Sequence, residues 1–149
     1  MVDKTGIDLW DEPSDAKCIT TNGFVKKNGE GVMGAGVAKQ ATVRYSGIAA
    51  TLGTVLRTRG NHVAALAYNY DHIVLAFPVK HHWRKPAELE LIERSAHELV
   101  AFLDEYFLSL ENFKVLLPRP GCGNGQLRWE DVKPVLEPIL DDRVWVIDR

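Results

Sequence analysis

The stretch Leu117-Pro-Arg-Pro-Gly-Cys-Gly-Asn-Gly-Gln-Leu127 joins an apolar run to a segment with a helical pattern that starts near Trp129. Its glycines, Gly121, Gly123 and Gly125, stand at alternate positions and carry no side chain, so a ligand can approach the backbone amides closely. The start of a helix favours a negative group, because unpaired N–H groups and the helix dipole both point at it. We therefore predict that this loop binds phosphate.

A second glycine-rich turn, Gly31-Val-Met-Gly-Ala-Gly-Val-Ala38, also precedes a helical pattern, and two such loops suggest a diphosphate ligand. In open α/β sheets, ligands bind outside the carboxyl ends of strands, where the chain turns into helices. Both loops occupy such positions, and Asn22 and the Phe77-Pro-Val-Lys80 segment follow other expected strands. We expect these four segments to converge on one cleft.

Strands and helices alternate along the chain, which predicts one α/β domain spanning residues 1–149. The sheet is expected to be largely parallel and partly mixed, with helices on both sides. The runs 62–68 and 72–77 have the spacing of a hairpin. The other strands are expected at 5–9, 17–21, 113–117 and 144–147, and the helices at 34–45, 47–59, 86–107 and 129–140.

The composition is that of an ordinary globular protein, with 46% hydrophobic and 26% charged residues. The net charge of -2 gives no general attraction to nucleic acid, so such a substrate would need a local patch like 81–85. Cys18 and Cys122 lack metal-type spacing and fit a reducing compartment, and no apolar stretch is long enough to cross a bilayer. We expect a cytoplasmic monomer with no cofactor, no metal and no membrane contact.

Lys80 follows an expected strand and precedes the basic residues His81, His82, Arg84 and Lys85. Desolvation and cationic neighbours favour the neutral amine of a lysine, which can attack a carbonyl carbon such as the aldehyde of a ring-opened sugar. A phosphate clamp or a solvated surface lysine is the alternative, and position alone favours that alternative. The adjacent histidines have no partners at metal spacing, which argues against a metal site.

Other residues near the expected cleft each leave two interpretations open. Cys122 is either a nucleophile beside a helix start or, more simply, a small packed residue. Asp8, near the end of the first expected strand, either accepts a hydrogen bond from a purine amino group or is a solvated carboxylate. Trp83 is either a stacking surface or a packed residue of the rim. Glu130 and Asp131 are explained by the dipole of the helix that they begin.

Asn22, the 31–38 turn and the 117–129 loop together resemble a macrodomain, a class of protein that binds ADP-ribose. The closer likeness is to DarG-type DNA ADP-ribosyl glycohydrolases and to the related terminal ADP-ribose protein glycohydrolases. In that group, a Phe-Pro-x-Lys-x-x-Trp-Arg run similar to 77–84 precedes the long helix, and a Gly-Cys-Gly-Asn-Gly-x-Leu-x-Trp loop follows the next strand. The resemblance covers nearly the whole chain and implies a three-layer α/β/α sandwich with a mixed, mostly parallel sheet.

The resemblance also implies roles for individual residues. Lys80 is similar to the catalytic lysine, which engages the anomeric carbon of the distal ribose and forms a covalent sugar adduct that water resolves. Asp8 is similar to the acid that recognises adenine, and Asn22 to the residue that contacts the distal ribose. The remaining expected contacts are Gly34, Ala35, Gly36 and Val37 beside the distal ribose and diphosphate, Pro120, Gly121, Cys122, Gly123, Asn124 and Gly125 around the diphosphate, and His82, Trp83 and Arg84 toward the substrate.

The function implied is removal of ADP-ribose from a macromolecule, with a DNA base as the expected attachment point. The alternatives are a non-catalytic module that binds ADP-ribose or a modified partner, and a hydrolase of a small derivative such as ADP-ribose 1''-phosphate. The segment 23–30 is longer than its DarG-type counterpart, which leaves the choice of substrate open. Gly125 stands where the protein-directed branch has a catalytic aspartate, so hydrolysis of a carboxylate-linked ADP-ribose by that route is not expected.

Overall fold

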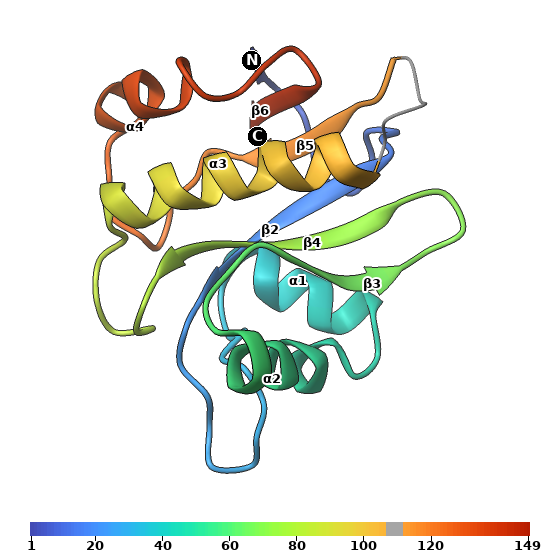
Figure 1. Cartoon of the computed structure of the whole chain (residues 1–149), viewed down its shortest axis with the longest axis vertical. Helices are drawn as coiled ribbons and strands as arrows, with labels where there is room; N and C mark the ends of the chain where they lie inside the picture. The colour runs from blue at the N-terminus through green and yellow to red at the C-terminus, as the bar shows by residue number, and fades with distance from the viewer. Residues whose placement is uncertain (107–111) are drawn as a thin grey trace.

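The computed structural model describes residues 1–106 and 112–149, which build one six-stranded sheet (Figure 1). Its strands are β1 (Val2–Thr5), β2 (Ala16–Asn22), β3 (Ala64–Tyr68), β4 (Ile73–Lys80), β5 (Val115–Pro118) and β6 (Val144–Asp148). The order across the sheet is β1-β6-β5-β2-β4-β3. All neighbouring strands are parallel except β3, which pairs antiparallel with β4 and confirms the predicted hairpin.

Helices cover both faces of this sheet, as predicted. In Figure 1, α1 (Gly36–Arg44) and α2 (Ile48–Arg59) lie on one side of the sheet, and α3 (Leu89–Tyr106) and α4 (Trp129–Leu136) lie on the other. The arrangement is a three-layer α/β/α sandwich. The expected end of the long helix at Phe107 lies outside the described residues. Within those residues, no helix is long and apolar enough to cross a membrane.

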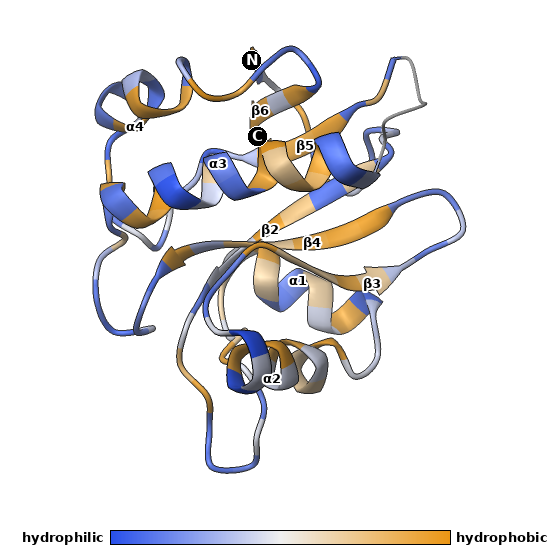
Figure 2. Ribbon diagram, viewed as in Figure 1, coloured by the Kyte–Doolittle hydropathy of each residue, from blue (hydrophilic) through white to orange (hydrophobic). Residues whose placement is uncertain are grey.

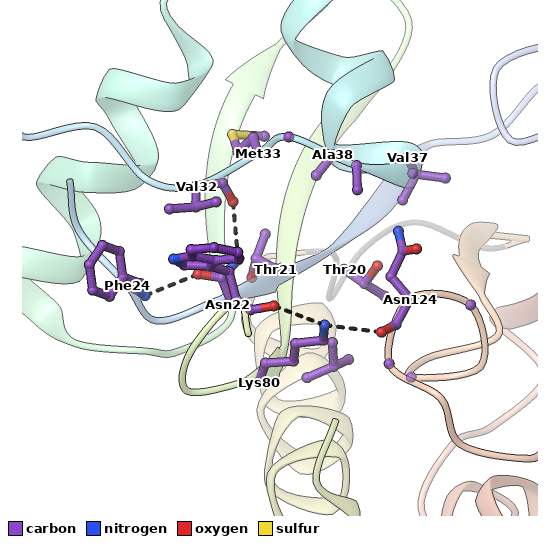
Figure 3. A pocket seen from close by; sticks show the side chains of 18 of the residues that line it. Thr20, Thr21, Asn22, Phe24, Val32, Met33, Val37, Ala38, Lys80 and Asn124 are labelled. Atoms are coloured by element: carbon purple, nitrogen blue, oxygen red, sulfur yellow. Dashed lines mark hydrogen bonds between the residues drawn. The ribbon is translucent and has the colours of Figure 1, made fainter. Parts of the chain in front are cut away.

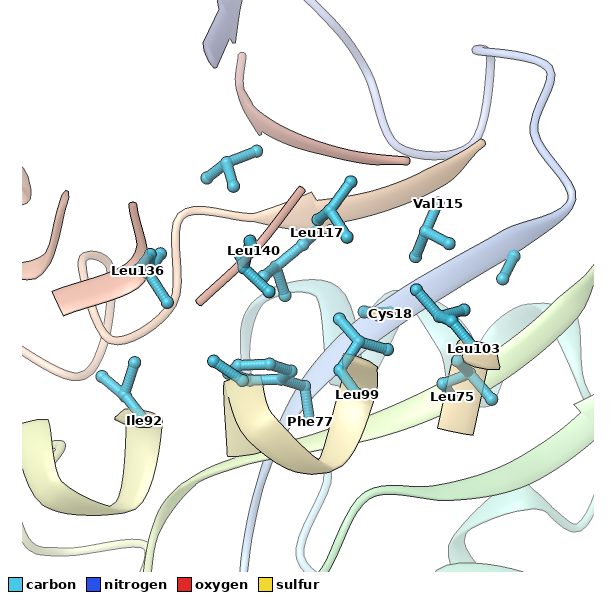
Figure 4. Packing of buried hydrophobic residues seen from close by; sticks show 14 of the residues in the cluster. Cys18, Leu75, Phe77, Ile92, Leu99, Leu103, Val115, Leu117, Leu136 and Leu140 are labelled. Atoms are coloured by element: carbon cyan, nitrogen blue, oxygen red, sulfur yellow. The ribbon is translucent and has the colours of Figure 1, made fainter. Parts of the chain in front are cut away.

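Alternate residues of the central strands pack against the helices on opposite faces of the sheet. Figure 2 shows the apolar strands in orange. Leu75 and Phe77 of β4 belong to the cluster beneath α3 and α4 (Figure 4), whereas Val74 and Ala76 belong to the cluster beneath α1 and α2. All of these side chains are buried. Apolar side chains on both faces of a strand explain why its sequence reads as a continuous hydrophobic run.

Two predicted boundaries were wrong because of single residues near them. The first strand was expected at 5–9 but is Val2–Thr5, because Gly6 adopts a φ of +72° that ends the extended backbone. The last helix was expected to reach residue 140 but ends at Leu136. Pro138 follows closely and has no N–H with which to continue the helical hydrogen bonds.

The start of α3 was also predicted too early, and the reason involves the candidate site. The helix was expected from Pro86 but begins at Leu89. The Ala87 amide donates to the carbonyl of Gly125 at 3.0 Å, and the Glu88 amide donates to the carbonyl of Val79 at 3.0 Å. These long-range bonds hold the segment before α3 against the glycine loop in place of a first helical turn.

Candidate functional site

Three neighbouring strands end at the edge of the sheet where the predicted site residues lie. In the parallel pairing of β2 with β4, Asn22 is opposite Lys80, after a register shift between Thr21 and Asn22. On the other side of β2, β5 ends at Pro118 and leads into the glycine loop. The fold therefore places the two polar side chains beside each other and the glycine loop next to them.

A cavity of about 970 Å³ opens at this edge (Figure 3). Its volume lies within the range of roughly 300–1,000 Å³ that is usual for small-molecule sites. The lining comes from the end of β2, the turn before α1, the end of β4 and the loop after β5. The predicted residues that line it are Asn22, Gly34, Ala35, Gly36, Val37, Lys80, Trp83, Arg84, Gly121, Gly123, Asn124 and Gly125.

Lys80 is the last residue of β4, and its amine lies at the wall of this cavity. The Nζ atom donates to the carbonyl oxygen of Asn124 at 3.1 Å and to that of Trp83 at 3.4 Å. Figure 3 draws Lys80 between Phe24 on one side and Asn124 on the other. An ammonium has three hydrogens, so these two bonds leave one for a ligand.

The backbone that carries Lys80 is itself held by two side chains. Asn61 Nδ2 donates to the Lys80 carbonyl at 2.9 Å. Ser95 on α3 is fully buried, and its hydroxyl donates to the carbonyl of Pro78 at 2.6 Å. Both bonds fix the end of β4 from outside the cavity.

Asn22 uses its side-chain amide to connect the strand end to the loops around it. Its Nδ2 donates to the Val32 carbonyl at 3.1 Å, and its Oδ1 accepts from the Phe24 amide at 3.1 Å (Figure 3). An asparagine amide group carries two N–H donors. One of them therefore stays available to a ligand in the cavity.

The turn before α1 presents helix amides to the same cavity. Gly36 has a φ of +56°, a conformation that favours glycine, and Ala35 caps the helix without a side-chain hydrogen bond. The first turn of α1 contains no acidic residue. Unpaired amides at a helix start attract an anion, so this turn can receive a phosphate.

The loop after β5 offers a second set of amides. Among the residues that the structure describes, the amides of Gly123, Asn124 and Gly125 have no backbone acceptor. Helix α4 begins at Trp129, as predicted, and residues 126–128 lie between Gly125 and this helix. The helix start that lines the 970 Å³ cavity is thus that of α1.

Two glycines of this loop are required by their surroundings. Gly121 has a φ of +77°, and a Cβ atom there would lie 2.9 Å from Ile92 Cδ1. A Cβ atom on Gly125 would lie 2.5 Å from the carbonyl oxygen of Gly121 and 2.7 Å from Ala87 Cβ. The loop has no room for a carboxylate side chain at Gly125.

A second cavity of about 530 Å³ adjoins the first. The two share lining residues, among them Val37 and Gly123, so together they form one groove. Asp8 lines the second cavity, where its Oδ1 accepts from the Trp10 amide at 2.9 Å and its Oδ2 lies 3.2 Å from Arg149 Nε. The structure thus places Asp8 beyond the glycine loops, away from the cavity that contains Lys80.

Three of the predicted contacts, Pro120, His82 and Cys122, do not line the 970 Å³ cavity. Pro120 is buried and lines neither cavity, and His82 also lies outside both linings. Cys122 lines the second cavity, and burial raises the pKa of its thiol, which disfavours the nucleophilic thiolate. Within 1–106 and 112–149, no group of three or more His, Cys, Asp or Glu residues is arranged to hold a metal ion.

The sequence reasoning missed two cavity residues on the loop between β2 and the glycine turn. Phe24 and Lys26 both line the 970 Å³ cavity. In the sequence, Phe24 directly follows Gly23, in the turn predicted after the strand. This position was the signal that could have indicated Phe24 as a site residue. Its position depends on how the loop folds back, which local patterns do not reveal.

Comparisons with known proteins agree with this architecture. No protein-family model matches the chain. It is 32% identical to a DNA ADP-ribosyl glycohydrolase of Thermus aquaticus over 151 residues, covering 94% of this chain and 39% of that protein. It is similar in structure to the macrodomain of Mycobacterium tuberculosis DarG, with a TM-score of 0.79, 27% identity and coverage of 99% and 97%. The macrodomain of Thermus aquaticus DarG gives a TM-score of 0.77, also at 27% identity.

The sandwich, its strand order and the groove at the strand ends define this chain as a macrodomain. Within that class it belongs to the DarG type, as the similarity over nearly its whole length shows. The chain spans 39% of the length of the Thermus relative.

Proposed function

We propose that this chain binds ADP-ribose along the groove and hydrolyses the bond between the distal ribose and a DNA base. The observation that carries the proposal is the pairing of Lys80 with Asn22 at one end of the groove, with glycine amides in the middle and Asp8 beyond them. This order of amine, amides and carboxylate matches ribose, diphosphate and adenine. The relatives named DNA ADP-ribosyl glycohydrolases support the choice of DNA.

In this proposal, each part of the ligand meets a group of complementary chemistry. The adenine amino group donates to Asp8, which lies beside the exposed Arg149 guanidinium and keeps acceptor positions open. The diphosphate accepts from the amides at Gly36 and around Gly123, and bonds to a charged acceptor are stronger than neutral ones. The remaining N–H of Asn22 donates to a hydroxyl of the distal ribose.

The proposed reaction uses the Lys80 amine as the nucleophile. Nζ loses a proton and attacks the anomeric carbon, while the bond to the base breaks and the base takes the electron pair and a proton. Ring opening converts the sugar adduct to an imine, and water hydrolyses that imine to ADP-ribose and the original amine. The net change is the addition of one water molecule across the ribose–base bond.

The test is release of ADP-ribose from a single-stranded DNA oligonucleotide that carries ADP-ribose on a base. We expect Lys80→Ala to lower the rate of ADP-ribose release by more than about 100-fold. The variant protein should still bind ADP-ribose in a calorimetric titration. Lys85→Ala is the matched control, because Lys85 is an exposed member of the same basic run that lines neither cavity. Borohydride added during turnover should trap a sugar adduct on the wild type and on K85A, but not on K80A.

Three outcomes would replace the proposal. Unchanged turnover by K80A would remove Lys80 from the chemistry. Tight ADP-ribose binding by the wild type without turnover would indicate a sensing module. Release of phosphate from ADP-ribose 1''-phosphate, with no action on the modified oligonucleotide, would indicate a hydrolase of small derivatives.

A further inference from the structure

An aromatic cluster is formed by Phe24 after β2 and by His82 and Trp83 after β4. Phe24 and Trp83 line the 970 Å³ cavity, and His82 lies outside its lining and contacts both of their rings. The Phe24 and His82 rings meet edge to face, with centroids 4.8 Å apart and an interplanar angle of 64°. The His82 and Trp83 rings are stacked, with centroids 5.7 Å apart and planes 24° apart. The three rings thus form a continuous aromatic surface built from two separate segments.

This surface is open to solvent. Phe24 is 37% exposed and Trp83 is 43% exposed. Among the described residues, neither one belongs to the two hydrophobic clusters that pack the sheet against its helices. Single exposed apolar residues are ordinary, but two exposed rings that line the same cavity are available to a ligand.

The rings are held in place from both sides. The Phe24 amide donates to Asn22 Oδ1 at 3.1 Å, and the loop beyond it is closed by the Val25–Gly31 bridge. On the other segment, the Arg84 amide donates to His82 Nδ1 at 3.1 Å, which fixes the imidazole ring. A surface arranged before binding loses little conformational freedom when a ligand arrives.

The position of the cluster relates it to the reacting end of the groove. The Trp83 carbonyl accepts a hydrogen bond from Lys80 Nζ, and Phe24 follows closely after Asn22, which pairs with Lys80. A group attached to the distal ribose would therefore leave the cavity along these rings.

The charges beside the rings indicate what kind of group this is. The Arg84 guanidinium lies over the Trp83 ring, 4.9 Å from its centroid. The half-exposed Lys26 lines the same cavity, with its Nζ 3.9 Å from a carboxylate oxygen of Glu30. Aromatic faces beside cations suit a planar base followed by a phosphodiester, as in single-stranded nucleic acid. An acidic or hydroxylated amino-acid side chain would use the cations but has no ring to stack.

We propose that Phe24, together with His82 and Trp83, stacks on the nucleobase that carries the ADP-ribose, so that this cluster determines the preference for a base over an amino acid. This proposal rests on the proposed function for the orientation of ADP-ribose in the groove. Phe24 is the residue to test, because its loop lies outside the motif that carries Lys80.

The experiment measures affinity in a Lys80→Ala background, which prevents turnover, for two ligands. One is an ADP-ribosylated single-stranded oligonucleotide, and the other is free ADP-ribose, which lacks the base. Phe24→Leu is expected to weaken binding of the oligonucleotide about tenfold and to leave binding of ADP-ribose unchanged. Phe24→Tyr keeps a ring and is expected to retain the wild-type affinity. Val43→Ala, at a residue of α1 that is 81% exposed, is the control for loss of an exposed apolar side chain.

Equal affinity of F24L and wild type for the oligonucleotide would overturn the stacking site, and so would an equal loss for both ligands. The glycohydrolase proposal is judged separately, from turnover of the oligonucleotide by protein with Lys80 intact. If that turnover is absent while F24L still weakens oligonucleotide binding selectively, the stacking site stands and the reaction does not. If turnover is normal and F24L binds as the wild type does, the reaction stands and the stacking site does not.

Discussion

One added methyl group should have opposite effects on stability at two glycines of the same loop. A Cβ atom on Gly125 would lie 2.5 Å from the Gly121 carbonyl oxygen and 2.7 Å from Ala87 Cβ, whereas nothing lies within 4 Å of a Cβ atom on Gly123. Neither glycine has a φ in the left-handed region, so both backbones accept alanine. Only the space around the new methyl group differs between the two substitutions.

The size of the effect follows from two opposing contributions. Replacing glycine by alanine restricts the unfolded chain and stabilises the protein by about 0.4–1 kcal/mol where the site accepts the methyl group. Overpacking a filled site costs roughly 1–3 kcal/mol, and at Gly125 the closest atom is backbone, which yields less easily than a side chain. We therefore expect Gly123→Ala to be neutral or slightly stabilising, and Gly125→Ala to lose about 1–2 kcal/mol and several degrees of Tm.

Urea unfolding gives both free energies, provided that the dependence on urea is the same in each variant. A titration with ADP-ribose separates stability from binding. Gly123 lines both cavities, so its methyl group should weaken ADP-ribose binding without lowering the unfolding midpoint. If Gly125→Ala unfolded at the same urea concentration as Gly123→Ala or a higher one, the close approach at Gly125 would not be what fixes this loop.

Three further predictions concern Asn61, Asp141 and Cys122. Asn61→Ala should lower kcat for the proposed reaction about 10- to 100-fold and leave ADP-ribose affinity unchanged, because Asn61 touches the Lys80 carbonyl and lines neither cavity. A rise in KM alone would contradict this positioning role. The hydrogen bond from Arg143 holds the pKa of the Asp141 carboxyl below its ordinary value of 3.8, so the pair stabilises the fold above that pH and stops doing so as the pH falls through the lowered value. Urea midpoints of Asp141→Asn should consequently depend less on pH in that acid range than those of the wild type, and parallel curves would refute the linkage. Cys122→Ser should keep full turnover, because burial raises the pKa of the thiol and disfavours the thiolate. If the folded variant lost turnover, the thiol would take part in the reaction.

The sheet and its layers could be predicted because their signals are local. The apolar run around Leu116 is covered on both faces in the structure, as an unbroken hydrophobic strand requires. Helix α3 buries Ile92, Leu99 and Leu103 at the helical spacing seen in the sequence. These patterns depend only on which face of an element meets the core, so one sequence suffices to recognise them.

Trp83 and Arg84 were predicted beside the substrate and line the cavity, but the position of Phe24 could not be predicted, because it depends on contacts between distant segments. Phe24 reaches His82 only because the loop after β2 folds against α2, where the Gly31 amide donates to the Ala49 carbonyl at 2.9 Å. A Cβ atom on Gly53 of α2 would lie 1.8 Å from the Gly29 carbonyl oxygen, so that approach also depends on a glycine far along the chain. Neither contact produces a periodic pattern in the sequence around these residues.

The glycine loop also explains why the proposed chemistry comes from β4, which β2 separates from β5 in the sheet. The crowding at Gly125 leaves this loop no side chain there, and the amides it exposes are donors that can hold an anion but cannot act as a base or a nucleophile. The carbonyl of Asn124 in the same loop instead accepts a hydrogen bond from Lys80 Nζ, across from β4. In the proposed function, binding and chemistry are therefore divided between two segments that share one hydrogen bond.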